Sequence, residues 1–139
     1  MLERYLILRE KYDPNEFSDE NMDFLLNKIK SLSSKRMFSD YEDFINPETN
    51  FESPILMYKN KFERYIVVTN FTLTSDSYSG DGAEITFDAM LKNKVTKQVE
   101  TSSYKAVMNY IISDLSLVSQ KKAPFCFAVT DYKTYKLSK

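Results

Sequence analysis

The residues best suited to gripping a phosphate or a cation lie in one short stretch. The sequence SGDG at 79–82 holds both glycines of the chain, and Asp76 precedes it. A phosphate loop requires a helix N-terminus directly after its glycines, but AEITFDAML at 83–91 alternates with the period of a strand. A calcium loop that began at Asp76 would place Tyr78 and Gly80 where oxygen ligands are required. The stretch is therefore predicted to be the turn of a β-hairpin.

Side-chain parity predicts the length of this turn. Apolar residues on both sides of it carry odd numbers: Tyr65, Val67, Phe71 and Leu73 before it, and Ala83, Ile85, Phe87, Ala89 and Leu91 after it. In an antiparallel pair, odd residues face odd residues only if the loop holds an odd number of residues. We expect a three- or five-residue loop, or a bulge, with a glycine at positive φ.

Other candidates for chemistry are few. The chain has no histidine, which removes the commonest general base near neutral pH and the commonest zinc ligand. Its one cysteine, Cys126, lies in an apolar segment with no basic neighbour, so a buried and unreactive thiol is expected. Asp40, Glu42 and Asp43 could form a cation site or an acid pair, but a solvated first helical turn is the favoured interpretation. The sequence predicts a protein that is not an enzyme and needs no cofactor or metal.

The elements that must position any site follow from hydrophobic periodicity. A long helix is predicted over 13–36 with Ser18 as its N-cap, and a short extra helix over 38–48 with Ser39 as its cap. The segment 4–12 fits either a short strand or a helical turn. The remaining predicted elements are strands at 53–59, 62–74, 83–92 and 124–139, and a second long helix at 102–120.

These elements define one α+β domain over residues 1–139. We expect a mainly antiparallel sheet of about four or five strands with a long hairpin, and two longer helices packed on it. The short extra helix completes the prediction.

Charge is divided unevenly along the chain. Residues 1–91 carry 10 basic and 17 acidic side chains, whereas residues 92–139 carry nine lysines and three acids. The basic part could contact nucleic acid, protect an edge strand, or meet the acidic part of another copy. Nucleic acid ranks below protein because the lysines are not joined by clustered arginines and the pI is about 5.6. The residues chosen as the interface are the hairpin tip and the C-terminal tail: Ser77, Tyr78, Ser79, Gly80, Asp81, Lys133, Tyr135 and Lys136.

Location is predicted from what the sequence lacks. No run approaches the roughly 20 apolar residues of a membrane helix, and charges interrupt the first ten residues, unlike a secretory signal. A single cysteine fits a reducing compartment. A virion or the host cytoplasm is expected, with neither secretion nor membrane attachment.

The predicted order of elements resembles that of small structural proteins from the tails and necks of tailed phages, in particular tail terminators. The likeness rests on MDFLLNKIKSL at 22–32, ESPILMYK at 52–59, the hairpin at 71–91, YKAVMNYIISDL at 104–115 and the final strand. It implies a ring-forming part of a phage tail, neck or baseplate that binds its own copies and neighbouring virion proteins. The extra short helix at 40–46 and the possible first strand depart from that plan. The alternatives are a small phage or mobile-element protein that binds a host protein or nucleic acid, and a histidine-free hydrolase.

Overall fold

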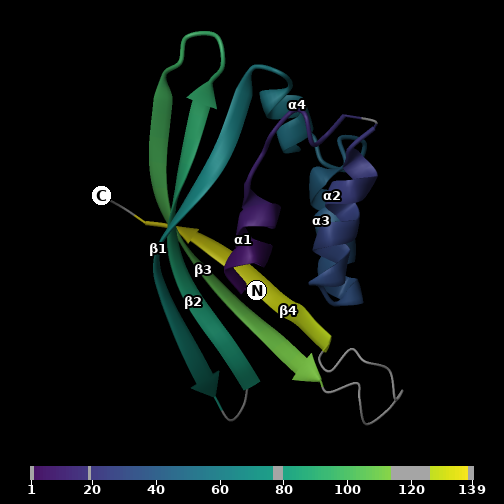
Figure 1. Ribbon diagram of the computed structural model, residues 1–139, viewed down its shortest axis with the longest axis vertical. Helices are drawn as coiled ribbons and strands as arrows, with labels where there is room; N and C mark the ends of the chain where they lie inside the picture. The colour runs from purple at the N-terminus through teal and green to yellow at the C-terminus, as the bar shows by residue number, and fades with distance from the viewer. Residues whose placement is uncertain (1, 19, 77–79, 114–125, 138–139) are drawn as a thin grey trace.

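The computed structural model describes residues 2–18, 20–76, 80–113 and 126–137, in which four helices precede four strands. The helices are α1 (Leu2–Glu10), α2 (Met22–Ser31), α3 (Lys35–Ile45) and α4 (Pro54–Tyr58). The strands are β1 (Phe62–Asp76), β2 (Gly80–Asn93), β3 (Val99–Ser113) and β4 (Cys126–Lys136). The strands form one antiparallel sheet in the order β1-β2-β3-β4, and the helices lie against one side of it (Figure 1). The predicted α+β class, antiparallel sheet, long hairpin and packed helices are confirmed.

The core lies between the helices and alternate residues of the central strands. Between Ala83 and Met90 on β2, the odd-numbered residues are buried, whereas their even-numbered neighbours are partly exposed. On β3 the same face presents Ala106 and Met108, and the small residues among these leave room for the large side chains of the helices. The buried members on the two central strands are Ala83, Ile85, Phe87, Ala89, Ala106 and Met108.

Helix α1 packs directly on this face of the sheet. Its buried residues include Tyr5 and Leu6, neither of which has measurable exposure. Leu2 and Leu8 of the same helix are buried as well. The N-terminal segment, which fitted either a strand or a helical turn, is therefore a helix.

The caps of α2 and α3 differ from those expected. Helix α3 begins at Lys35 because Ser34 is its N-cap, with the Ser34 hydroxyl accepting a hydrogen bond from the Met37 amide at 3.2 Å. The predicted cap Ser39 lies inside the helix. Helix α2 begins at Met22 rather than near Ser18, whose hydroxyl instead donates to the Asn15 carbonyl at 3.0 Å.

Two segments have the opposite secondary structure to the one predicted. The helix expected over 102–120 is wrong, because 99–113 is strand β3 and 114–125 lies outside the described residues. The apparent helical stripe combined two faces of a strand: Met108 is buried, whereas Ile111 is 52% exposed. The strand expected over 53–59 is wrong as well. Ser53 caps helix α4 and Pro54 occupies its first turn, where the missing amide hydrogen costs nothing.

The register of the β1–β2 hairpin agrees with the parity prediction near its tip. Phe71 pairs with Ile85 and Leu73 with Ala83, and the last pair encloses the three residues 77–79, which are themselves outside the description. A bulge at Thr69 shifts the register by one residue nearer the base. It turns Tyr65 and Val67 to the face away from the helices, so their predicted place beside Phe71 and Leu73 is wrong.

Gly82 is required by close packing rather than by a special backbone angle. Its φ lies outside the left-handed region, so the expected positive φ does not fall on Gly82, and for Gly80 it stays a prediction. A Cβ atom at this position would lie 2.8 Å from the Thr74 hydroxyl and 3.0 Å from the Met108 carbonyl oxygen. A larger residue at this position would therefore force the Thr74 side chain and the β3 backbone at Met108 to shift.

Replacing Gly82 with alanine should lower the free energy of unfolding by about 1–3 kcal/mol, because the added methyl group overpacks the strand. Urea unfolding followed by circular dichroism measures the change. A Gly82→Ala, Thr74→Ala chain should recover part of the loss, since the hydroxyl contact is removed while the carbonyl contact remains. Equal stability of Gly82→Ala and the parent would contradict the close approach.

Candidate interaction surfaces

The structure does not bring the predicted interface residues together. Gly80 and Asp81 begin β2 and pair with the end of β1, on one side of the sheet. Lys133, Tyr135 and Lys136 are exposed on β4, the strand at the opposite edge. The two groups therefore form separate surfaces, and residues 77–79 are not described. That either group contacts a partner stays a prediction.

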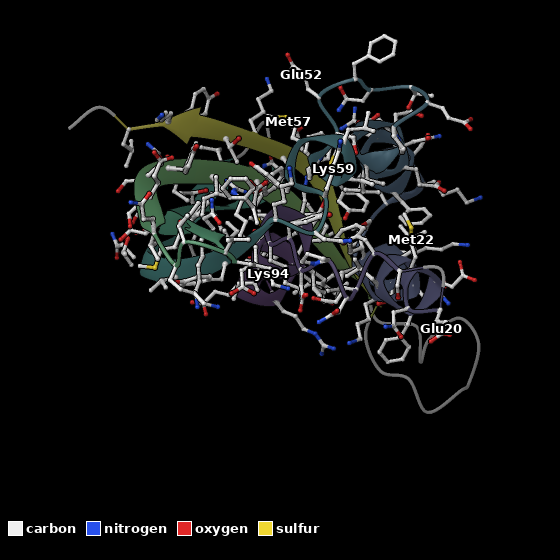
Figure 2. All side chains as sticks on the ribbon, turned by 90° about the horizontal axis from the view of Figure 1, so that it is seen from above. Glu20, Met22, Glu52, Met57, Lys59 and Lys94 are labelled. Carbon is white, nitrogen blue, oxygen red and sulfur yellow. The ribbon has the colours of Figure 1, made fainter. Side chains whose placement is uncertain are left out.

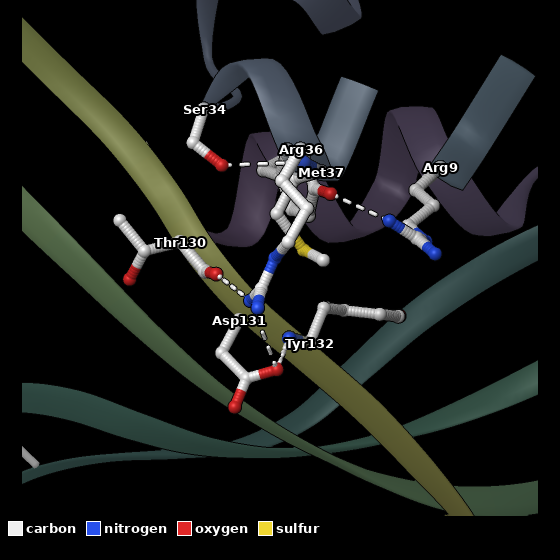
Figure 3. Close-up of polar contacts among 8 residues, drawn as sticks. Arg9, Ser34, Arg36, Met37, Thr130, Asp131 and Tyr132 are labelled. Atoms are coloured by element: carbon white, nitrogen blue, oxygen red, sulfur yellow. Dashed lines mark hydrogen bonds and ion pairs between the residues drawn. The ribbon is translucent and has the colours of Figure 1, made fainter. Parts of the chain in front are cut away.

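The first half of the β4 edge is covered by the connection between α2 and α3. The Val129 amide donates to the Leu32 carbonyl at 2.8 Å, and the Ser34 amide donates to the Val129 carbonyl at 2.9 Å. Arg36 donates to the Thr130 carbonyl at 2.6 Å and lies 3.9 Å from the Asp131 carboxylate (Figure 3). The ion pair is exposed and contributes little, but the backbone bonds leave this stretch unable to accept another strand.

A polar cluster that sequence patterns did not reveal joins α1, β1 and β4. The Glu10 carboxylate accepts a hydrogen bond from Arg64 at 3.1 Å and another from the Tyr132 hydroxyl at 2.8 Å. The Arg9 guanidinium lies over the Tyr132 ring, 4.5 Å from its centroid, and donates to the Tyr5 hydroxyl at 2.8 Å. The cluster fixes the first helix to the last strand.

Burial in this region changes the ionisation of two tyrosines. The pKa of Tyr132 is raised well above 10.0, chiefly by burial. The negative charge of Glu10 and the hydrogen bond to its carboxylate raise this pKa further. Burial also raises the pKa of Tyr41, and its hydroxyl has no hydrogen-bond partner among the described atoms. Both phenols are therefore neutral at physiological pH, and neither is suited to act as a base.

A cavity of about 250 Å³ opens beside the cluster, between α1, the α3–α4 region and the sheet. Met57 belongs to α4 and Glu52 precedes that helix; the two lie near each other in the view of Figure 2 and line one wall. Two of its cations are already paired, Arg64 with Glu10 at 3.1 Å and Lys11 with Glu16 at 2.8 Å. The volume is below the roughly 300–1,000 Å³ of most ligand sites, so the cavity suits a small flat group at most.

The other candidates for chemistry remain apart. Asp40, Glu42 and Asp43 are exposed along α3, away from its first turn. Among the described residues no group of three or more acidic, cysteine or histidine side chains could hold a metal ion. Cys126 begins β4 opposite Ser113, and its side chain is not among those described. In the part of the chain that the structure covers, no helix is long and apolar enough to cross a membrane.

Known structures share this architecture, although sequence comparison does not find relatives: no protein family and no curated protein matches the chain. The Agrobacterium tumefaciens VirB8 protein is similar with a TM-score of 0.74 and 18% identity, over 99% of this chain and 88% of that one. A TrwG component of a type IV secretion system from Bartonella birtlesii gives a TM-score of 0.72 at 18% identity, over 99% and 88%. CagV, a VirB8 homologue of the Helicobacter pylori type IV secretion system, gives 0.68 at 12% identity, over 97% and 93%.

The sheet and its helical layer thus define an α+β fold that the chain shares with these proteins. Within that class, the chain has the VirB8-like form.

The resemblance to phage tail terminators is wrong. It depended on a helix between the hairpin and the last strand, and that segment is strand β3 with all described helices ahead of the sheet. The proteins with matching structures are type IV secretion components, so assignment to a phage virion, tail, neck or baseplate is wrong as well. Placement in a virion or the host cytoplasm, away from any membrane, falls with it, because a secretion system works at a membrane. The coarser prediction, a protein that works within a multi-protein assembly, agrees with the description of TrwG as a component of a secretion system.

Replacing Tyr132 with phenylalanine tests the cluster through the pH dependence of stability. Because the folded-state pKa of Tyr132 is above its unfolded value of 10.0, its stabilising effect is complete below about pH 10 and is lost as pH rises toward the folded pKa. The variant should lose about 1–3 kcal/mol at neutral pH, where the bond to Glu10 is missing, and show a shallower decline above pH 10.

Urea unfolding at a series of pH values measures both effects. Tyr135→Phe on the same strand removes an exposed hydroxyl and serves as the control, with stability at neutral pH within about 0.5 kcal/mol of the parent. A Tyr132→Phe chain whose alkaline decline matches that of the parent would refute the role of this phenol.

Proposed function

We propose that this chain is a non-enzymatic, VirB8-like assembly subunit of a bacterial type IV secretion system. The observation that carries the proposal is the extent of the structural match, which runs over 99% of this chain and 88% of the VirB8 chain. A sheet alone recurs in many unrelated proteins. Here both the helical layer and the sheet match those of the VirB8 structure, which favours a shared role.

The partners proposed are other copies of the chain and neighbouring subunits of the same machine. The described surface offers strand edges and exposed apolar side chains, such as Phe51 at 88% exposure. Phe51 lies in a connection that is held by side-chain bonds, including that from the Ser53 hydroxyl to the Ile45 carbonyl. An aromatic ring on a rigid segment is a good anchor for another protein.

The site of action proposed is the bacterial envelope, since a secretion system moves material across a membrane. A part of such a machine works by position and contact, which agrees with the paired charges of Arg64 and Lys11 and with the small volume of the cavity that they line.

Deletion of the gene in the bacterium that carries it should reduce transfer of a marked conjugative plasmid, or export of a secreted reporter, to the background level. A wild-type copy supplied in trans should restore it. A copy with Asp40, Glu42 and Asp43 changed to alanine should restore it equally, because these exposed carboxylates perform no chemistry. Unchanged transfer after deletion would refute the proposed function, and failure of the triple variant alone would refute its non-enzymatic character.

A further inference from the structure

The two edges of the sheet are protected very differently. Strand β4 is covered by backbone bonds at Val129, and its open remainder carries Lys133 and Lys136. Charged residues and covering loops are the usual means of preventing an edge from pairing with another strand. Both are present on β4.

The β1 edge has almost no such protection. Among the described residues, the outer side of β1 forms backbone bonds at Arg64 alone, two of 2.8 Å with Tyr12. From there to the end of β1, no further backbone bond on the outer side is formed within the described residues. The run YIVVTNFTLTS at 65–75 contains no charged residue and no proline, and it is rich in β-branched and aromatic side chains.

Register determines which backbone groups point outward. The backbone amide and carbonyl of Arg64 point away from β2, because they bond to Tyr12. Backbone direction alternates along a strand, so the backbone groups of Ile66 and Val68 also point away from β2. The bulge at Thr69 changes the parity, and beyond it Phe71 and Leu73 point outward. The side chains of Ile66, Val68 and Phe71 lie on the helix side, packed against the core.

This pattern is self-complementary. When two β1 edges are aligned antiparallel about an axis between Thr69 and Asn70, Ile66 of one copy faces Leu73 of the other, and Val68 faces Phe71. Outward groups then meet outward groups at every position, which gives about eight backbone hydrogen bonds. The remaining pairs, Tyr65 with Thr74 and Val67 with Thr72, contain no charge.

We propose that β1 pairs with β1 of a second copy of this chain over residues 65–74, which joins the two sheets into one. The pairing covers two exposed apolar side chains, Leu73 at 61% and Val67 at 43%. It also leaves the lysine-bearing β4 edges at the two far ends, where their charges do not repel. The surface is argued from the strand alone and does not depend on the proposed function.

The mass of the untagged chain in solution, measured by sedimentation over a range of concentrations, tests the pairing. The parent should form a dimer. Leu73→Pro should raise the dimer dissociation constant by about tenfold or more, since each copy loses an outward amide donor. The Leu73 amide does not bond to β2, so this proline leaves the hairpin ladder intact.

A matched pair of lysine variants separates the edge from a general charge effect. Val67→Lys lies on the proposed interface, whereas Val99→Lys lies on β3, and the two valines are 43% and 45% exposed. Val67→Lys should weaken the dimer, and Val99→Lys should not.

Cysteine pairs test the register. In a Cys126→Ser background, V67C/T72C should oxidise to a covalent dimer, because these positions face each other across the axis as a pair without backbone bonds. The two positions are too far apart along one strand to bridge within a chain. V67C/T74C, displaced by two residues, should not cross-link.

A parent chain that stays monomeric at every concentration would overturn the proposal. A dimer that survives Leu73→Pro and Val67→Lys equally, or cross-links V67C/T74C in preference to V67C/T72C, would overturn it too. If Leu73→Pro fails to fold by circular dichroism, the lysine pair and the cysteine pairs decide the matter on folded chains.

Discussion

The alternation of side chains along β2 is the constraint on which the rest of the structure depends. From Ala83 to Ala89 the odd-numbered residues of this central strand are buried, with Ile85 and Phe87 at 0% and 1% exposure. Even-numbered residues form polar contacts on the other face, where Glu84 lies 3.5 Å from Lys105 and Asp88 accepts a bond of 2.7 Å from Ser103. The helices can therefore pack on one face only, because burying the other would leave charged groups without water.

Two bulges adjust the outer strands to this central pattern. The bulge at Thr69 changes which β1 side chains meet the helices, and the one at Thr130 lies where the α2–α3 connection crosses β4. One edge is thereby covered and the other is left with a long uncharged run. The division of charge follows the same axis, since residues 1–91 include β1 and almost all of β2, whereas the lysine-rich remainder includes β3 and β4. Most of the acidic side chains of residues 1–91 lie ahead of β1, in the helical layer, so the excess of acid belongs to the helices more than to the strands.

The cluster around Glu10 gives the helical layer a fixed position on this sheet. Its partners come from residues 54 and 122 positions away in sequence, Arg64 and Tyr132. A largely buried carboxylate with two donors is costly to break and contributes to specifying one packing arrangement. This contact explains why α1, a short helix with little amphipathic character of its own, is held so firmly against the strands.

The sequence by itself determined the elements whose signals are local. Period-two patterns predict the strands at 62–74, at 83–92 and in the C-terminal segment, and a helical pattern predicts the helix around 22–31. Side-chain parity predicts that the hairpin loop holds an odd number of residues. It could not determine β3, because apolar residues at 104, 107, 108 and 111 fit a helical face as well as the two faces of a strand. Only pairing with β2 and β4 decides between them. The same reason applies to the polar cluster, to the β1 edge and to the separation of the predicted interface residues, since strand neighbours and edges are properties of the assembled sheet. Local periodicity fixes which face of a segment is apolar, whereas the partner that covers this face is chosen by contacts distant in sequence.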